Sequence, residues 1–143
     1  MTKIKFYDKV DEKLFKFAVI ISKANNQWVF CKHRDRDTYE VPGGHREAGE
    51  DILETAKREL NEETGAIDFD IKPICAYSVT APNNFEGQET FGMLYYADIK
   101  SFDNKLCYEI EKVILTDDLV DNWTYPEIQP KLLEEARRRK ILK

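Results

Sequence analysis

The stretch of sequence that decides the fold is GHREAGEDILETAKRELNEETGA, residues 44–66. Residues 50–64 are rich in helix formers and contain neither Gly nor Pro, so they predict a helix over this range. Asp51 stands where an N-cap or first-turn acid belongs, and Gly65 is placed to end the helix. The segment therefore predicts one well-delimited helix that follows a glycine-containing loop.

Three glutamates gather on one side of this predicted helix. Successive helical residues are about 100° apart, so Glu59, Glu62 and Glu63, at positions i, i+3 and i+4, fall within a sector of about 100°. The adjoining apolar face consists of Leu53, Ala56 and Leu60. We therefore expect one side of the helix to dock on a sheet while the neighbouring side presents three carboxylates together.

This cluster of like charges has two interpretations. Acidic side chains at i and i+4 repel each other by a few tenths of a kcal/mol, so the triplet is either a solvated acidic face or a set of ligands for a hard cation. Carboxylates on a rigid element suit Mg²⁺ or Mn²⁺. The preceding Gly43 and Gly44 favour the cation, because a glycine backbone can approach it closely and its carbonyls are oxygen ligands.

Outside this segment, strand-like runs precede and follow the helix. Apolar or alternating runs predict strands over residues 17–22, 27–33, 71–80, 90–99 and 111–115. A second helix is expected to begin at Pro126, and the basic run 137–140 at its end compensates the helix dipole. Its apolar stripe consists of Ile128, Leu132, Leu133 and Ala136. This order predicts a single α+β domain over residues 1–143, with a mixed sheet between helices.

Composition excludes several classes of protein. With 143 residues, 42% of them hydrophobic, and a net charge of −5, the chain has material for one core. It has no apolar run near the ~20 residues of a membrane span and no secretory segment at its start. Net acidity argues against binding to a nucleic acid polymer, and no obligate protein partner is indicated. The three cysteines form no CxxC pair and the two histidines no metal pattern, which predicts reduced thiols, a cytoplasmic location and no zinc site.

Residues 44–66 resemble the Nudix box, GX5EX7REUXEEXGU, position for position. Gly44 and Glu50 match its first two fixed residues, and the run RELNEETGA matches the remainder. Seven fixed identities at fixed spacing arise by chance on the order of 10⁻⁸ or less per start position. Ala66 stands where a larger aliphatic residue is usual, a departure that affects packing rather than chemistry. The preceding YEVPGG, residues 39–44, looks like the strand and loop before the box in this family, whose fold is an α/β/α sandwich with a mixed central sheet.

The resemblance implies roles for individual residues of the box. Glu59, Glu62 and Glu63 match the family's metal-binding glutamates. The Gly43 carbonyl matches a backbone ligand, and Mg²⁺ or Mn²⁺ is the implied metal. Arg58 looks like the arginine that orients the catalytic carboxylates by ion pairing. The predicted catalytic residues are therefore Glu59, Arg58 and Glu62, with Glu59 as the candidate base and metal ligation as its competing role.

The ion-pair partner of Arg58 is expected to lie in the preceding turn or loop. Neighbouring helical residues point about 100° apart, which directs Arg58 away from Glu59. Glu54 at i−4 and Glu50 are the candidate partners. Glu50, the outlying glutamate of the box, is expected to support the loop and helix through a salt bridge.

Many members of the family recruit a further carboxylate from a later strand or loop. Glu109 and Glu111 are best placed for this here, and strand alternation puts both on one face, so the choice between them stays open. Each is equally well explained as a surface acid of a strand.

Residues outside the box are expected to contact the nucleotide. Members of this family contact it from the stretch before the Pro-Gly-Gly loop, which implies Arg34 and Tyr39. Trp123 and Tyr125, just before the second predicted helix, either stack on a base or cap the core beside that helix.

The implied reaction is hydrolysis of a nucleoside diphosphate linked to a moiety X. The chain is similar to MutT-like pyrophosphohydrolases, which implies conversion of a nucleoside triphosphate such as 8-oxo-dGTP to monophosphate and pyrophosphate. ADP-ribose or another nucleotide sugar is the alternative substrate, because Pro82 lies where a proline accompanies ADP-ribose hydrolysis in some members, although a hairpin turn explains it equally well. A Nudix-fold module that binds a nucleotide without hydrolysis is the third alternative, and the intact box argues against it.

Overall fold

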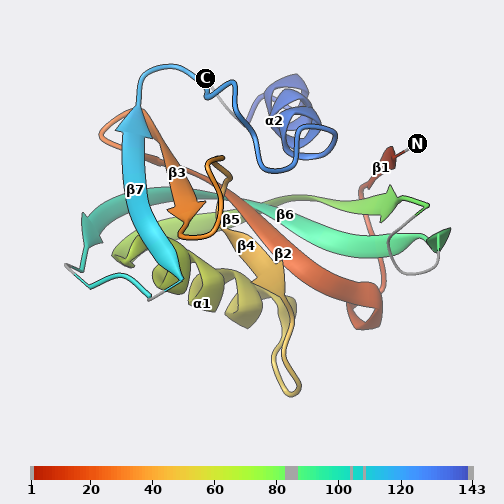
Figure 1. The fold of residues 1–143 in the computed structure, drawn as a ribbon. Helices are drawn as coiled ribbons and strands as arrows, with labels where there is room; N and C mark the ends of the chain where they lie inside the picture. Colours follow the sequence, from red (N-terminus) through yellow and green to blue (C-terminus); the bar gives the residue numbers. More distant parts are fainter. Residues whose placement is uncertain (1, 83–86, 104, 108, 142–143) are drawn as a thin grey trace.

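The computed structural model describes residues 2–82, 87–103, 105–107 and 109–141, and its central element is a mixed sheet of seven strands (Figure 1). The strands are β1 (Lys3–Tyr7), β2 (Phe15–Ala24), β3 (Gln27–His33), β4 (Gly43–His45), β5 (Ala66–Thr80), β6 (Thr90–Phe102) and β7 (Ile110–Thr116). Their order across the sheet is β1-β5-β6-β2-β3-β7, and β4 pairs with β2. Strands β2 and β6 run parallel, while the other strand pairs in the described residues are antiparallel.

Strand β2 changes partner along one edge, and this fork positions the glycine loop. It pairs with β3 only at Lys23 and Ala24, and with β4 through residues 17–19. Between these two pairings, the Pro42 carbonyl accepts a hydrogen bond of 2.9 Å from the Ile20 amide. The fork therefore carries β4 into the middle of the sheet, where α1 packs against it.

Helices α1 (Ile52–Thr64) and α2 (Gln129–Arg138) cover opposite faces of the sheet (Figure 1). Each helix packs on its own hydrophobic cluster, and alternating residues of β2 contribute to both clusters. Ile20 faces the cluster under α1, and Ile21 faces the cluster under α2. The predicted α+β fold, an α/β/α sandwich with a mixed sheet, is confirmed.

Helix α1 has both predicted caps but a different buried face. Asp51 is the N-cap and forms a capping box with Glu54, and Gly65 ends the helix at a φ of 79°. The helix begins two residues later than predicted. The buried row consists of Ile52, Ala56 and Leu60. The prediction that Leu53 belongs to this row was wrong, because Leu53 lies about 100° further round the helix from Ile52 and is 39% exposed.

Helix α2 begins at Gln129, so the predicted start at Pro126 was wrong. The Tyr125 carbonyl accepts hydrogen bonds from the amides of Ile128 and Gln129, which makes the intervening residues a turn before the helix. Pro130 instead occupies the first helical turn, where a missing N–H group costs no intrahelical bond. The buried residues of the predicted stripe are Leu132, Leu133 and Ala136.

The basic end of α2 has ion-pair partners in addition to the helix dipole. Glu135, which is buried, pairs with Arg138 at 2.5 Å and with Arg139 at 2.8 Å, and Arg139 also reaches Asp8 at 3.0 Å.

In the ranges that the structure describes, neither α2 nor α1 is long and apolar enough to cross a membrane.

The strand predictions were accurate at the apolar centres and incomplete at the ends. Strand β3 has the predicted bounds, whereas the other four predicted strands are longer than their apolar runs. Strands β5 and β6 pair over almost their whole length, from Ala66–Phe102 to Val79–Thr90, so their polar ends are held by each other. Strands β1 and β4 were not predicted. A three-residue strand with two glycines carries no periodic signal, and its pairing with β2 defines it.

Candidate active site

Glu63 is held against the sheet edge by two hydrogen bonds. Its Oε1 accepts from the Gly43 amide at 2.7 Å, and its Oε2 lies 3.0 Å from His33 Nε2. The hydrogen bond to Glu63 is the main reason that the pKa of His33 is raised. The helix residue predicted as a metal ligand is thus attached to the loop that was predicted to approach the metal.

Glu59 lies directly over Gly44. A Cβ atom placed on Gly44 would be 2.5 Å from Glu59 Oε1 and 2.7 Å from Oε2, so only glycine leaves room for this carboxylate. The Glu59 side chain is 13% exposed. Burial, and then the charge of Glu63, raise its pKa to about 7, although Arg58 opposes this shift. Glu59 is therefore a desolvated carboxylate with incomplete charge compensation.

Arg58 links the carboxylates of the helix to the loop. Its Nε donates to Glu50 Oε2 at 2.6 Å, which confirms the predicted pair and contributes to holding the pKa of Glu50 at about 2. Its Nη1 also donates to Glu59 at 2.7 Å and lies 3.3 Å from Glu62. The expectation that Arg58 points away from Glu59 was wrong, because the long guanidinium stem spans the 100° between adjacent residues. The other candidate, Glu54, is engaged in the capping box instead.

The donor set fits a hard cation, although its side chains are turned towards protein partners. Within the described residues no three acidic, His or Cys side chains are grouped closely enough to hold a metal ion. Glu59 and Glu62 face Arg58, and Glu63 faces Gly43 and His33. The residues available for ligation are nevertheless carboxylates on one rigid helix, and after burial the charge of Glu63 is the next cause of the raised pKa of Glu59. Hard divalent cations prefer such oxygen donors.

The later carboxylates have contacts away from this cluster. Glu111 pairs with Lys32 at 3.0 Å across β3 and β7. Glu109 precedes β7, and its carbonyl accepts from the Arg34 amide at 2.9 Å. In the part of the chain that the structure describes, no contact brings Glu109 or Glu111 together with the α1 glutamates, and the choice between them stays a prediction.

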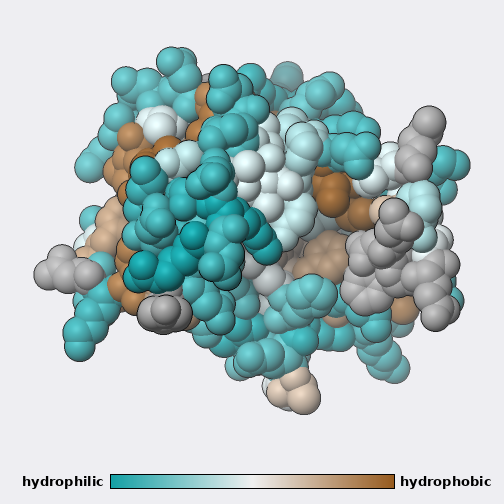
Figure 2. All heavy atoms as spheres, in the orientation of Figure 1, coloured by the Kyte–Doolittle hydropathy of each residue, from teal (hydrophilic) through white to brown (hydrophobic). Residues whose placement is uncertain are grey.

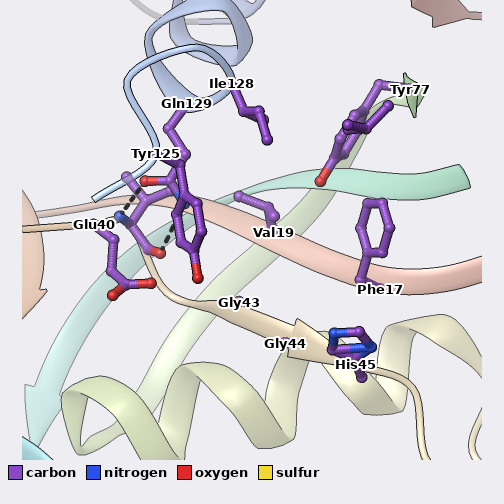
Figure 3. Close-up of a pocket in the computed structure, with 12 residues that line it drawn as sticks. Phe17, Val19, Glu40, Gly43, Gly44, His45, Tyr77, Tyr125, Ile128 and Gln129 are labelled. Atoms are coloured by element: carbon purple, nitrogen blue, oxygen red, sulfur yellow. Dashed lines mark hydrogen bonds between the residues drawn. The ribbon is translucent and has the colours of Figure 1, made fainter. Parts of the chain in front are cut away.

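A cavity of about 470 Å³ lies on the α2 side of the sheet, next to the same glycine loop (Figure 3). Its lining residues come from β2, β4, β5, the loop before β4 and the start of α2: Phe17, Val19, Glu40, Val41, Gly43, Gly44, His45, Tyr77, Val79, Tyr125, Ile128 and Gln129. In the space-filling view, apolar and pale residues gather between the α2 region and the sheet, framed by hydrophilic surface (Figure 2). The volume is in the range of small-molecule sites.

The aromatic residues predicted to contact the nucleotide have different positions. Tyr125 lines the cavity, and Arg36 lies 5.9 Å from the centre of its ring. Trp123 packs edge-on against buried Phe30 at 5.4 Å, which is the core-capping alternative. The backbone of Tyr39 forms an isolated β-bridge with Trp123, and the centre of the Tyr39 ring lies 5.8 Å from Lys112 Nζ.

A polar chain that the sequence did not predict joins the cavity to the glutamate cluster. Glu40, buried on the cavity wall, lies 2.9 Å from Arg36 and 3.5 Å from His33, which in turn contacts Glu63. Burial raises the pKa of Glu40. Gln129 Oε1 accepts from the Val41 amide at 2.9 Å. The one sequence feature that could have indicated this polar chain is Glu40, an acidic residue inside the strand-like run before Pro-Gly-Gly. The other residues of the polar chain have no distinctive spacing in the sequence.

Without divalent cations, we expect the free energy of unfolding to fall as pH rises through neutrality. The folded chain keeps a proton on Glu59 up to a pKa of about 7, whereas the usual value is 4.5. The unfolded chain releases that proton earlier, so this stabilising contribution is present at low pH and is lost between these two values. Urea denaturation in EDTA at about pH 5.5 and about pH 8 measures the slope. The variant E59Q should remove part of it, and identical slopes in both proteins would contradict the prediction.

Comparison with known proteins finds a matching family model and a relative of the same kind. A family model for the NUDIX domain matches residues 14–142. YtkD of Bacillus subtilis (strain 168), named for a proposed 8-oxo-dGTP diphosphatase activity, is 32% identical over 108 residues, which are 75% of this chain and 65% of that relative. The chain thus spans slightly less than two thirds of the relative's length.

Solved structures show the same fold. A mutant form of the pyrophosphohydrolase BsRppH of Bacillus subtilis is similar with a TM-score of 0.80 and 24% identity, covering 99% of this chain and 93% of that one. A NUDIX hydrolase from Nitrosomonas europaea has a TM-score of 0.70 and 21% identity, covering 89% and 94%.

Proposed function

This chain belongs to the Nudix family, and from that membership we propose that it is a pyrophosphohydrolase that cleaves a nucleoside triphosphate to monophosphate and pyrophosphate. Members of the family generally use divalent metal ions, and we propose Mg²⁺ or Mn²⁺ here. The observation that carries the proposal is the position of the glycine loop, which has the α1 glutamates against it and a nucleotide-sized cavity beside it.

We propose that Glu59, Glu62 and Glu63, with the Gly43 carbonyl, hold the metal. A bound cation supplies charge neutralisation at phosphate oxygens and lowers the pKa of a water molecule. Glu62 is the most accessible of the three, with 44% of its side chain exposed, and needs only to leave Arg58 to become a ligand. Glu63 has a fixed orientation, because both of its oxygens already have partners.

Arg58 and Glu59 are proposed to prepare the attack on phosphorus. Arg58 is held by Glu50 on the loop side and contacts Glu59 with its other edge, so it fixes where the Glu59 carboxylate lies. Without a bound cation, burial and the charge of Glu63 raise the pKa of Glu59 to about 7. A cation beside Glu59 would lower this pKa and keep the carboxylate ionised, so that it can accept a proton from water near neutral pH. We propose that it combines this role with metal ligation.

The nucleoside is proposed to occupy the cavity on the α2 side. Aromatic walls suit a nucleobase, and the Gly43–Gly44 loop lies between the cavity and the glutamates, so phosphates would cross the loop towards α1. An oxidised nucleotide such as 8-oxo-dGTP is the proposed substrate, supported by the name of the 32% identical relative. Pro82 follows the end of β5 in a turn and is not among the described residues that line the cavity, so Pro82 does not favour ADP-ribose.

Two further properties are proposed. Residues 1–143 form one domain, because a single sheet supports both hydrophobic clusters. The protein acts in the cytoplasm on a small nucleotide, because Cys31, Cys75 and Cys107 are free thiols and two of them are buried.

A substrate panel tests this function. We expect dGTP and 8-oxo-dGTP to yield monophosphate and pyrophosphate with Mg²⁺, and we expect activity to disappear in EDTA and return with excess Mg²⁺. Chromatography of the products identifies the bond that breaks. Equal activity in EDTA would overturn the metal-dependent mechanism. Faster hydrolysis of ADP-ribose than of any triphosphate would replace the proposed substrate, and saturable binding without turnover would make the chain a binding module.

A further inference from the structure

Two aromatic side chains of the cavity wall fill a recess that three neighbouring strands form together. Phe17 of β2 and Tyr77 of β5 are both in register with Gly92 of β6, which lies between them. A Cβ atom on Gly92 would overlap the Phe17 ring and lie 2.9 Å from Tyr77 Cζ. The missing side chain therefore lets two aromatic rings lie across β6, with their centres 5.6 Å apart.

Tyr77 is held rigidly in this recess. Its side chain is among the largest in the core and is 1% exposed. Phe17 packs on it at an angle of 51°, and the Gly92 backbone lies close to the outer part of its ring. The position of its hydroxyl is thus determined by packing on the sheet.

The Tyr77 hydroxyl points into the cavity, towards the space between Val19, Ile128 and Phe17 (Figure 3). Among the described residues no hydrogen bond to this hydroxyl occurs, whereas the hydroxyl of Tyr7 binds Glu89 at 2.6 Å. Buried polar groups nearly always have a hydrogen-bond partner. The Tyr77 hydroxyl is not sealed in the core, since Ser22 Oγ is the one fully enclosed side-chain polar atom without a partner among the described residues. It is therefore open to the cavity and available to a ligand.

We propose that Tyr77 is a specificity-determining residue, whose hydroxyl hydrogen-bonds the polar edge of a nucleobase that lies in the cavity against Phe17. The inference rests on the proposed function, because that function places a nucleoside in this cavity. A tyrosine hydroxyl both donates and accepts, so it pairs with a carbonyl oxygen, a ring nitrogen or a ring N–H group. The side chains that it faces in Figure 3, Val19, Ile128 and Phe17, are apolar and would not stabilise the charge of a phosphate, which leaves the phosphates at the glycine-loop end.

The test compares Y77F with Y95F. Tyr95 is a matched control, because it is 4% exposed in the hydrophobic cluster on the α1 side of the same sheet. In Y77F we expect KM for the preferred triphosphate to rise at least about tenfold while kcat changes less than about twofold. Inhibition by inorganic pyrophosphate, which has no base, should be unchanged. The Tm of Y77F should equal or exceed that of the original chain, because the removed hydroxyl has no partner in the described part of the fold.

A binding measurement separates this inference from the proposed function. Calorimetry in EDTA with the four deoxynucleoside monophosphates should show a tightest-binding base, whose Kd rises at least about tenfold in Y77F and stays constant in Y95F. Turnover with an unchanged KM and Kd in Y77F would overturn the inference alone. Base-dependent binding that Y77F weakens, without any hydrolysis, would overturn the proposed function alone. A Kd that rises equally in Y77F and Y95F, or no binding of any monophosphate, would overturn the inference.

Discussion

Replacement of Glu59 by glutamine is expected to lower kcat by about 10³-fold or more, the largest loss from any single substitution in the chain. Among the described residues, Glu59 is the only one of the three clustered glutamates that combines a largely buried side chain, contact with Arg58 and direct contact with the glycine loop. The amide keeps the shape of the side chain but removes the charge. Steady-state kinetics with Mg²⁺ measure the loss of kcat, and titration with Mn²⁺ measures the change in metal affinity.

Three comparison variants test whether the effect is specific to Glu59. E62Q and E63Q should each lower kcat by about 10²-fold. E54Q removes an acidic charge from the same helix outside the site and should leave kcat unchanged, since Glu54 belongs to the capping box. A smaller loss in E59Q than in E62Q would refute the ranking.

The pH dependence assigns the role of Glu59. Loss of the acidic limb of the pH–rate profile in E59Q, with Mn²⁺ affinity intact, would identify a base. Weaker Mn²⁺ binding with an unchanged profile would identify a ligand. The proposed double role requires both changes.

Alanine substitutions at the two loop glycines are expected to have different effects: G44A should lower activity, and G43A should lower stability. In G44A the new Cβ meets the carboxylate of Glu59, the mobile end of a side chain, so the carboxylate moves and the fold remains. We expect kcat to fall by about 10²-fold, because a displacement near 1 Å at a reacting group can cost that much. Thermal melting should show a Tm within a few degrees of the original.

In G43A the new Cβ would lie 2.6 Å from the Ala18 carbonyl oxygen and 3.1 Å from Val19 Cα. Both atoms belong to the backbone of β2, so β4 has to separate from its partner strand. We expect the free energy of unfolding to fall by about 1–3 kcal/mol or more, measured by urea denaturation. An unchanged kcat in G44A, or equal stability losses in both variants, would contradict this separation.

Local interactions explain why α1 was predictable. Asp51 caps through its own turn, Gly65 ends the helix with a left-handed φ, and the acidic positions follow from helix periodicity. These features depend on residues at most four apart in sequence. Errors arose where a partner from elsewhere decides the outcome. Helix periodicity favoured Leu53 as the residue that faces the sheet. In the structure its neighbour Ile52 is buried there, and Leu53 is exposed.

The sequence by itself determined the fold class, the helix that carries the glutamates and the family of the chain, because box spacing and capping residues are encoded locally. Only the tertiary structure decided which groups meet across the sheet. The approach of Gly44 to Glu59, the bond between His33 and Glu63, and the Phe17–Gly92–Tyr77 recess each join segments more than a dozen residues apart. Strand register sets these contacts, and register depends on how both faces of the sheet pack at once.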